Sequence, residues 1–135
     1  MRCKLSGVCL FLAMITPPLR AYAQPSPEDV IASFKRTGLE AEKPTKMRPK
    51  DYGMAPYVCT GLRFLIPSLG ADSGGRIFAC PNDADRDAIA RYYQDLGRRS
   101  AAFFSSWVFV KRNVVVQING DLDDQTSEKY KEAIP

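Results

Sequence analysis

Two cysteines, Cys59 and Cys80, constrain the fold of this chain more than any other feature of its sequence. They lie in two strand-like segments, 57–66 and 75–80, which a Gly- and Ser-containing connection joins. We predict a disulfide that sets the two cysteines opposite each other in an antiparallel hairpin. On the chain-entropy model such a cross-link stabilises the fold by about 3 kcal/mol, whereas the alternative is a pair of buried free thiols.

This pairing fixes which side chains share a face of the hairpin, because strand side chains alternate between the two faces. Arg63 then lies opposite Arg76, on the same face as the disulfide. Five residues fall on the other face, which we expect to be the core: Thr60, Leu62, Phe64, Ile77 and Ala79.

Two arginines directly across a sheet repel each other, so we expect an acid or a bound anion beside Arg63 and Arg76. Asp72, in the connection between the strands, is the acid that the sequence offers. The alternative is a carboxylate or phosphate ligand held by both guanidinium groups, which makes the arginine pair a candidate anion-binding site.

The first 23 residues have the pattern of a cleavable secretory signal peptide. Arg2 and Lys4 precede an uncharged apolar run over residues 5–15, and Ala21-Tyr22-Ala23 supplies small residues for cleavage before Gln24. An apolar run of this length is too short to span a bilayer, which requires roughly 20 residues. We therefore expect an exported protein, periplasmic or secreted, in a compartment that favours disulfides.

Cleavage there leaves a single globular domain, residues 24–135, with no transmembrane segment. The signal removes three basic residues and no acid, so that 16 basic and 15 acidic residues remain, a net charge of +1. This balance disfavours nucleic acid as a partner, because it supplies no strong positive field. Only Cys59 and Cys80 remain as cysteines.

The remaining patterns predict an α+β fold with helices packed on one face of an antiparallel sheet of about four strands, in the order α-β-β-α-β-β-α. Ser26 begins a helix that Gly38 ends, and Asn82 begins a second that Gly97 can end. Residues 107–110 and 114–118 predict a hairpin, residues 122–134 a last helix, and residues 40–56 a long loop. The apolar hairpin favours cover on both of its sides, and a partner-binding face or edge is the alternative.

The chain contains no histidine, which excludes Ser-His-Asp triads, Cys-His dyads and His-bearing zinc sites. We find no recognisable catalytic motif and expect no cofactor. Two acid clusters remain: Asp83, Asp85 and Asp87, and Asp121, Asp123 and Asp124. Both precede helices, where acids favour the helix dipole, and neither has the glycine and glutamate of a calcium loop, so we expect no metal site.

The Gly-rich segment 70–76 invites comparison with an anion-binding nest of backbone amides. It lacks the spacing of a phosphate-binding loop and no helix follows it, so a flexible hairpin connection is the favoured interpretation.

The chain after Gln24 resembles small exported bacterial proteins of uncharacterised function. The residues that carry this resemblance are the segment RFLIP at 63–67, residues 87–93 and the segment NVVVQIN at 113–119. The resemblance implies a bacterial envelope or secreted location and brings no activity or site residues with it.

Three functional hypotheses follow. The first is a non-catalytic exported domain that binds a protein partner or small ligand at the bacterial envelope. The second is a small hydrolase that uses the carboxylates at Asp121, Asp123 and Asp124. The third is an anion- or polyanion-binding module built on Arg63, Arg76 and the basic loop 43–50.

Overall fold

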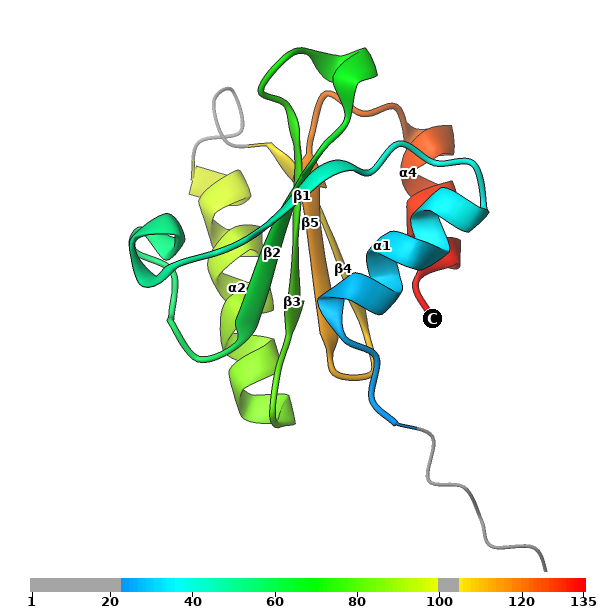
Figure 1. Ribbon diagram of the computed structural model, residues 1–135. Helices are drawn as coiled ribbons and strands as arrows, with labels where there is room; N and C mark the ends of the chain where they lie inside the picture. Colours follow the sequence, from blue (N-terminus) through cyan, green and yellow to red (C-terminus); the bar gives the residue numbers. More distant parts are fainter. Residues whose placement is uncertain (1–22, 100–104) are drawn as a thin grey trace, which may run out of the picture.

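A computed structural model describes residues 23–99 and 105–135 (Figure 1). The expected signal peptide, apart from Ala23, lies outside the described residues. The helices, strands and short 3₁₀ turns follow in this order: α1 (Pro27–Arg36), β1 (Glu42–Lys46), η1 (Pro49–Tyr52), β2 (Thr60–Leu65), η2 (Pro67–Leu69), β3 (Gly74–Ala79), α2 (Asp83–Arg99), β4 (Ser106–Lys111), β5 (Val114–Asn119) and α4 (Asp124–Ala133).

The strands form one antiparallel sheet in the order β1-β2-β3-β5-β4. The disulfide between Cys59 and Cys80 is present and confirms the prediction. The register between β2 and β3 is also the predicted one, with Arg63 opposite Arg76. The α+β class is therefore correct, and the sheet has one strand more than the sequence suggested.

That additional strand is β1, which lies in the segment 40–56 that the sequence pattern predicts to be a loop. Its five residues are exposed, and it forms an edge of the sheet, so it shows no apolar alternation. Pro44 reinforces the loop pattern, although proline is tolerated in edge strands because its missing N–H is not needed there.

The prediction that all helices pack on one face is wrong. Figure 1 shows α1 and α4 on one side of the sheet and α2 on the other, so the domain has three layers. The reason is visible in β5, where Val114, Val116 and Ile118 face α1 and α4 while Val115 packs in the cluster under α2. A strand buried on both sides needs cover on both sides. The other strand of the predicted hairpin, β4, is an edge strand of the sheet.

The larger of the two cores lies between the sheet and the pair α1 and α4. Phe34 packs edge-on against Tyr130, with ring centroids 5.0 Å apart, and Phe64 lies 5.8 Å from Phe34. The smaller core lies under α2 and contains the disulfide, Phe78 and Ile89.

The predicted starts of the first two helices are confirmed, whereas the last helix, predicted over residues 122–134, begins at Asp124 after its cap Asp123. The Ser26 hydroxyl accepts from the Asp29 N–H, and the Asp29 carboxylate accepts from the Ser26 N–H, as in a capping box. Asn82 caps α2 by accepting from the Asp85 N–H. The end of α2 was predicted two residues too early: the helix continues through Gly97, which does not adopt a positive φ.

No helix within the described ranges is both long and apolar enough to cross a membrane.

Candidate ligand-binding cleft

A row of paired residues crosses the sheet on the side of α2. The register places Thr45 opposite Arg63, Arg63 opposite Arg76, Arg76 opposite Gln117 and Gln117 opposite Val108. Directly opposed residues project to the same side of a sheet. The centre of this row is therefore polar, with two arginines and a glutamine on three adjacent strands.

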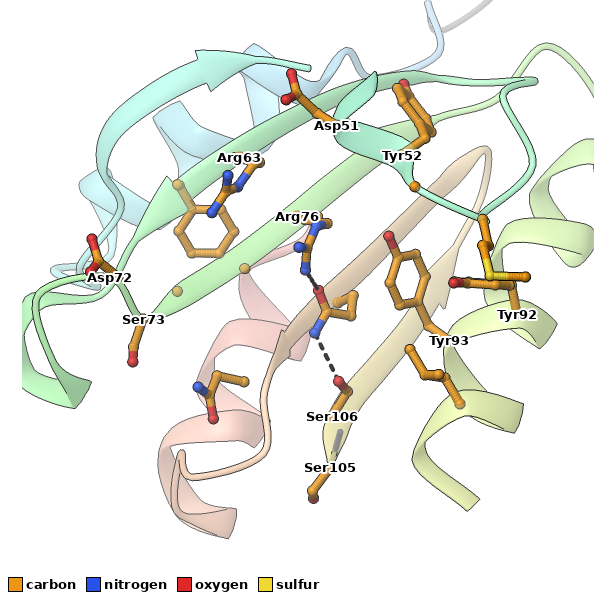
Figure 2. Close-up of a pocket in the computed structure, with 18 of the residues that line it drawn as sticks. Asp51, Tyr52, Arg63, Asp72, Ser73, Arg76, Tyr92, Tyr93, Ser105 and Ser106 are labelled. Carbon is orange, nitrogen blue, oxygen red and sulfur yellow. Dashed lines mark hydrogen bonds between the residues drawn. The ribbon is translucent and has the colours of Figure 1, made fainter. Parts of the chain in front are cut away.

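The neighbouring row towards the disulfide is apolar. Phe78 and Val115 lie there, packed in the same cluster as Ile89 and Ala90 of α2. The helix thus seals one part of this face, and beside the arginine row the surface opens into a cleft of about 530 Å³. Residues from η1, β2, β3, α2 and β5 line it (Figure 2).

Arg76 is held in place at the floor of the cleft. Its Nη1 donates to Gln117 Oε1 at 2.9 Å, and Gln117 Nε2 donates to Ser106 Oγ at 2.8 Å (Figure 2). The guanidinium carbon lies 5.8 Å from the centroid of the Tyr93 ring, within cation-π range. The Arg76 Nε is buried and has no hydrogen-bond partner among the described residues.

Arg63 is exposed beside Arg76 and makes no hydrogen bond or ion pair with any residue that the structure describes. Asp72 lines the cleft but forms no ion pair with either arginine. The acid that the sequence offered to compensate the pair therefore does not do so in this structure. Two adjacent guanidinium groups face the cleft without a carboxylate between them.

Three acids contribute to the cleft lining: Asp51, Asp72 and Asp121. The Asp51 carboxylate accepts from the Arg48 N–H at 2.7 Å, and this hydrogen bond is the main reason why the pKa of Asp51 is lowered. The Asp51 carboxylate is therefore already engaged with Arg48 in the η1 turn. Asp72 precedes β3 and Asp121 follows β5, so both lie at one end of the strands.

Two tyrosines in the cleft wall have a pKa above the usual value. Burial raises the pKa of Tyr93, and the positive charge of Arg76 opposes that shift. Burial also raises the pKa of Tyr52, whose hydroxyl donates to the Cys59 carbonyl at 2.6 Å. Gly61 leaves room for this ring, since a Cβ there would lie 2.6 Å from the Tyr52 hydroxyl oxygen. A hydrogen bond therefore connects Tyr52 of the cleft wall to the backbone of Cys59, one of the two disulfide cysteines.

Two of the three glycines in the segment 70–76 serve packing, and the third, Gly70, ends η2 with a positive φ. Gly74 and Gly75 belong to β3, where a Cβ on Gly74 would lie 2.0 Å from the Phe64 carbonyl oxygen. A Cβ on Gly75 would lie 2.5 Å from the Gln117 carbonyl oxygen and 2.8 Å from the Phe64 ring. These two positions need glycine for the close approach of adjacent strands, which accounts for them without an anion-binding nest.

The two acid clusters have local roles. Asp83 and Asp87 both form ion pairs with Arg86 at the start of α2. Asp123 caps α4 by accepting from the Thr126 N–H at 2.9 Å. Hydrogen bonding with the Thr126 side chain, and then with its N–H, lowers the pKa of Asp123. Within the described ranges, no group of three or more His, Cys, Asp or Glu residues is arranged to hold a metal ion.

The structure adds three residues that sequence reasoning did not single out: Tyr93, Ser106 and Gln117. Gln117 carried a detectable signal, because it interrupts the apolar run of β5. It is only 5% exposed, and a buried amide needs partners, which Arg76 and Ser106 provide. Tyr93 lies on the buried side of α2, and helical spacing in a sequence does not show that a ring on that side borders a cleft.

A scan against protein-family models, a search of curated proteins and a search of solved structures each find no match to this chain.

Proposed function

We propose that this chain is an exported, non-catalytic domain that binds a small anionic ligand in the cleft beside Arg63 and Arg76. The observation that carries the proposal is the state of Arg76. Its Nε is buried without a partner among the described residues, while Gln117 and Tyr93 hold the guanidinium in place. Buried polar groups normally have partners, and an anion is the natural partner of an arginine.

The neighbouring charges support the same ligand class. Arg63 lies directly opposite Arg76, and like charges across a sheet are destabilising unless something compensates them. An anion between the two guanidinium groups removes that repulsion and gains charge-assisted hydrogen bonds. Because Arg76 is already oriented, less side-chain freedom is lost when the ligand binds.

Binding without catalysis is favoured over hydrolysis. The chain has no histidine, and the acids that we considered as a catalytic cluster are divided between different tasks. Asp123 caps a helix, whereas Asp121 lines the cleft. Hydrolysis by a carboxylate pair, as in most glycosidases, requires both carboxyl groups to act on the same substrate.

Thermal unfolding with and without phosphate tests this function. A ligand at 100 times its Kd stabilises the folded state by about 2.7 kcal/mol, so saturating phosphate should raise the Tm of the wild type measurably against a chloride control at equal ionic strength. Arg76→Gln and Arg63→Gln should each abolish the shift. Arg91→Gln is the matched control, because it removes an exposed arginine of α2 that does not line the cleft.

If neither phosphate, sulfate nor a small carboxylate shifts the Tm of the wild type, the proposed function is wrong. An equal loss of the shift in Arg91→Gln would point to general charge screening. Export is tested separately by N-terminal sequencing of the secreted protein, which should begin at or near Gln24.

A further inference from the structure

A second, basic groove adjoins the cleft on the β1 side of Arg63. Its lining includes Lys43, Thr45 and Arg48 together with Arg63, and its volume is about 540 Å³. Arg63 lines both the cleft and the groove. A ligand that contacts Arg76 in the cleft therefore needs to extend past only one arginine to enter the groove.

The backbone of β1 is distorted where it borders this groove. The pairing with β2 shifts by one residue between Glu42 and Thr45, which is a β-bulge. Lys43 has φ +46°, an uncommon conformation for a residue other than glycine, and the Thr45 hydroxyl donates to the Lys43 carbonyl at 3.0 Å. Bulges at sheet edges redirect side chains, and strained residues that the surroundings hold in place are concentrated at binding sites.

The positive charges around Arg63 are concentrated on its β1 side. Lys43, Lys46 and Arg48 border the groove, where Asp51 is the acid present and is already paired with Arg48. The exposed carboxylates of the cleft, on Asp72 and Asp121, are not part of that groove. An anionic chain that begins at Arg76 is therefore attracted towards β1.

We infer that the ligand carries two or more anionic groups on a short chain, one bound at Arg76 and the next bound in the groove beside Lys43. Arg63 contacts the chain between these two positions. The ligand class is a linear oligoanion of the oligophosphate type, in contrast to a single phosphate or carboxylate group. This inference rests on the proposed function, because it extends the same site.

Isothermal titration of the whole mature domain with orthophosphate, pyrophosphate and tripolyphosphate tests the inference. At about 0.15 M ionic strength, exposed charges further apart than about 8 Å are largely screened, so a strong dependence on chain length requires close contacts. We expect tripolyphosphate to bind the wild type about tenfold more tightly than orthophosphate, the factor that one charge-assisted hydrogen bond supplies.

Lys43→Gln should remove most of this gain and leave the Kd for orthophosphate unchanged. Lys35→Gln, which removes an exposed lysine from α1, is the matched control and should retain the gain. Arg48→Gln provides a second variant in the groove should Lys43→Gln unfold.

The outcomes separate the two proposals. Orthophosphate and tripolyphosphate binding with equal affinity, or equal losses in Lys43→Gln and Lys35→Gln, would overturn the oligoanion and leave the anion site in place. Failure of all three phosphates to bind the wild type would overturn both proposals.

Discussion

The two faces of the sheet differ in how completely their helices cover them. Under α1 and α4, neighbouring strands present Leu62, Ile77 and Val116 in one row, and all three are almost fully buried. One residue further along β2 and β3, the side chains on the opposite face are Arg63 and Arg76. The alternation of a β-strand thus places a closed apolar core and an open polar cleft back to back.

This difference places the larger apolar core and the proposed ligand site on opposite faces of the sheet. The face under α1 and α4 removes large apolar side chains from water, which is the dominant favourable contribution to folding. The arginine row under α2 contributes little apolar burial and leaves a buried Nε without a partner among the described residues. Substitutions on the two faces should therefore have different consequences, and four predictions test this.

The largest effect is expected from Ile77→Ala. Ile77 is fully buried on a central strand, so the truncation removes apolar burial and leaves a cavity that costs about 2–5 kcal/mol. Arg76→Met, one residue away on the other face, should cost about 1 kcal/mol through the hydrogen bond lost to Gln117. Urea unfolding measures both. Equal losses would show that the two faces do not differ as described.

The sequence was informative where a residue acts through local geometry. The cysteine pair determined the register of β2 and β3, and Ser26 and Asn82 marked helix starts because capping depends on neighbours a few residues away. The face covered by α2 could not be predicted in this way. The apolar side of α2 can pack on either face of a sheet. Only the contacts of the helix with Val115 and Phe78 show which face α2 covers.

The candidate site was predicted in part. The register already placed Arg63 beside Arg76, because a disulfide fixes the strands around it. The partners of Arg76 lie far away in the sequence, since Gln117 comes from β5 and Ser106 from β4. Such contacts depend on the strand order, which no pattern within a single strand specifies. The groove beside β1 was missed together with the strand itself.

The disulfide should have the second largest effect. It links residues 21 positions apart within the closed part of the α2 face. Replacing both cysteines by alanine should cost about 2–4 kcal/mol, because the unfolded chain regains the freedom that the cross-link removes. Chemical unfolding of the double variant and of the oxidised wild type measures the difference. A loss below about 1 kcal/mol would mean that the disulfide adds little to the packing around it.

Tyr130 gives an intermediate effect that depends on pH. Its hydroxyl donates to the Glu40 carbonyl at 2.6 Å in the larger core, and burial raises its pKa well above the usual value. Above about pH 10 the unfolded chain ionises this tyrosine while the folded protein keeps the proton, so stability should fall as the pH rises.

Tyr130→Phe should therefore cost about 1 kcal/mol at neutral pH and flatten the alkaline decline in stability. Some decline should remain, because burial also raises the pKa of Tyr52 and Tyr93. Unfolding free energies measured at several pH values from about 8 to 11 test this. An alkaline slope identical to that of the wild type would contradict the role assigned to Tyr130.

The smallest effect on stability is expected from Arg63→Ala. The side chain is exposed and has no hydrogen bond or ion pair with the described residues, so its removal should change the unfolding free energy by no more than about 0.5 kcal/mol.

Arg63→Glu sharpens this prediction, because it places a carboxylate directly opposite Arg76. An opposite-charge pair across a sheet contributes roughly 0.2–1 kcal/mol, so this variant should be slightly more stable than the wild type in the absence of phosphate. The same carboxylate would occupy the position that we assign to the ligand, and phosphate should then no longer raise the Tm. A variant that is stabilised by the new carboxylate but still responds fully to phosphate would place the anion away from the arginine pair.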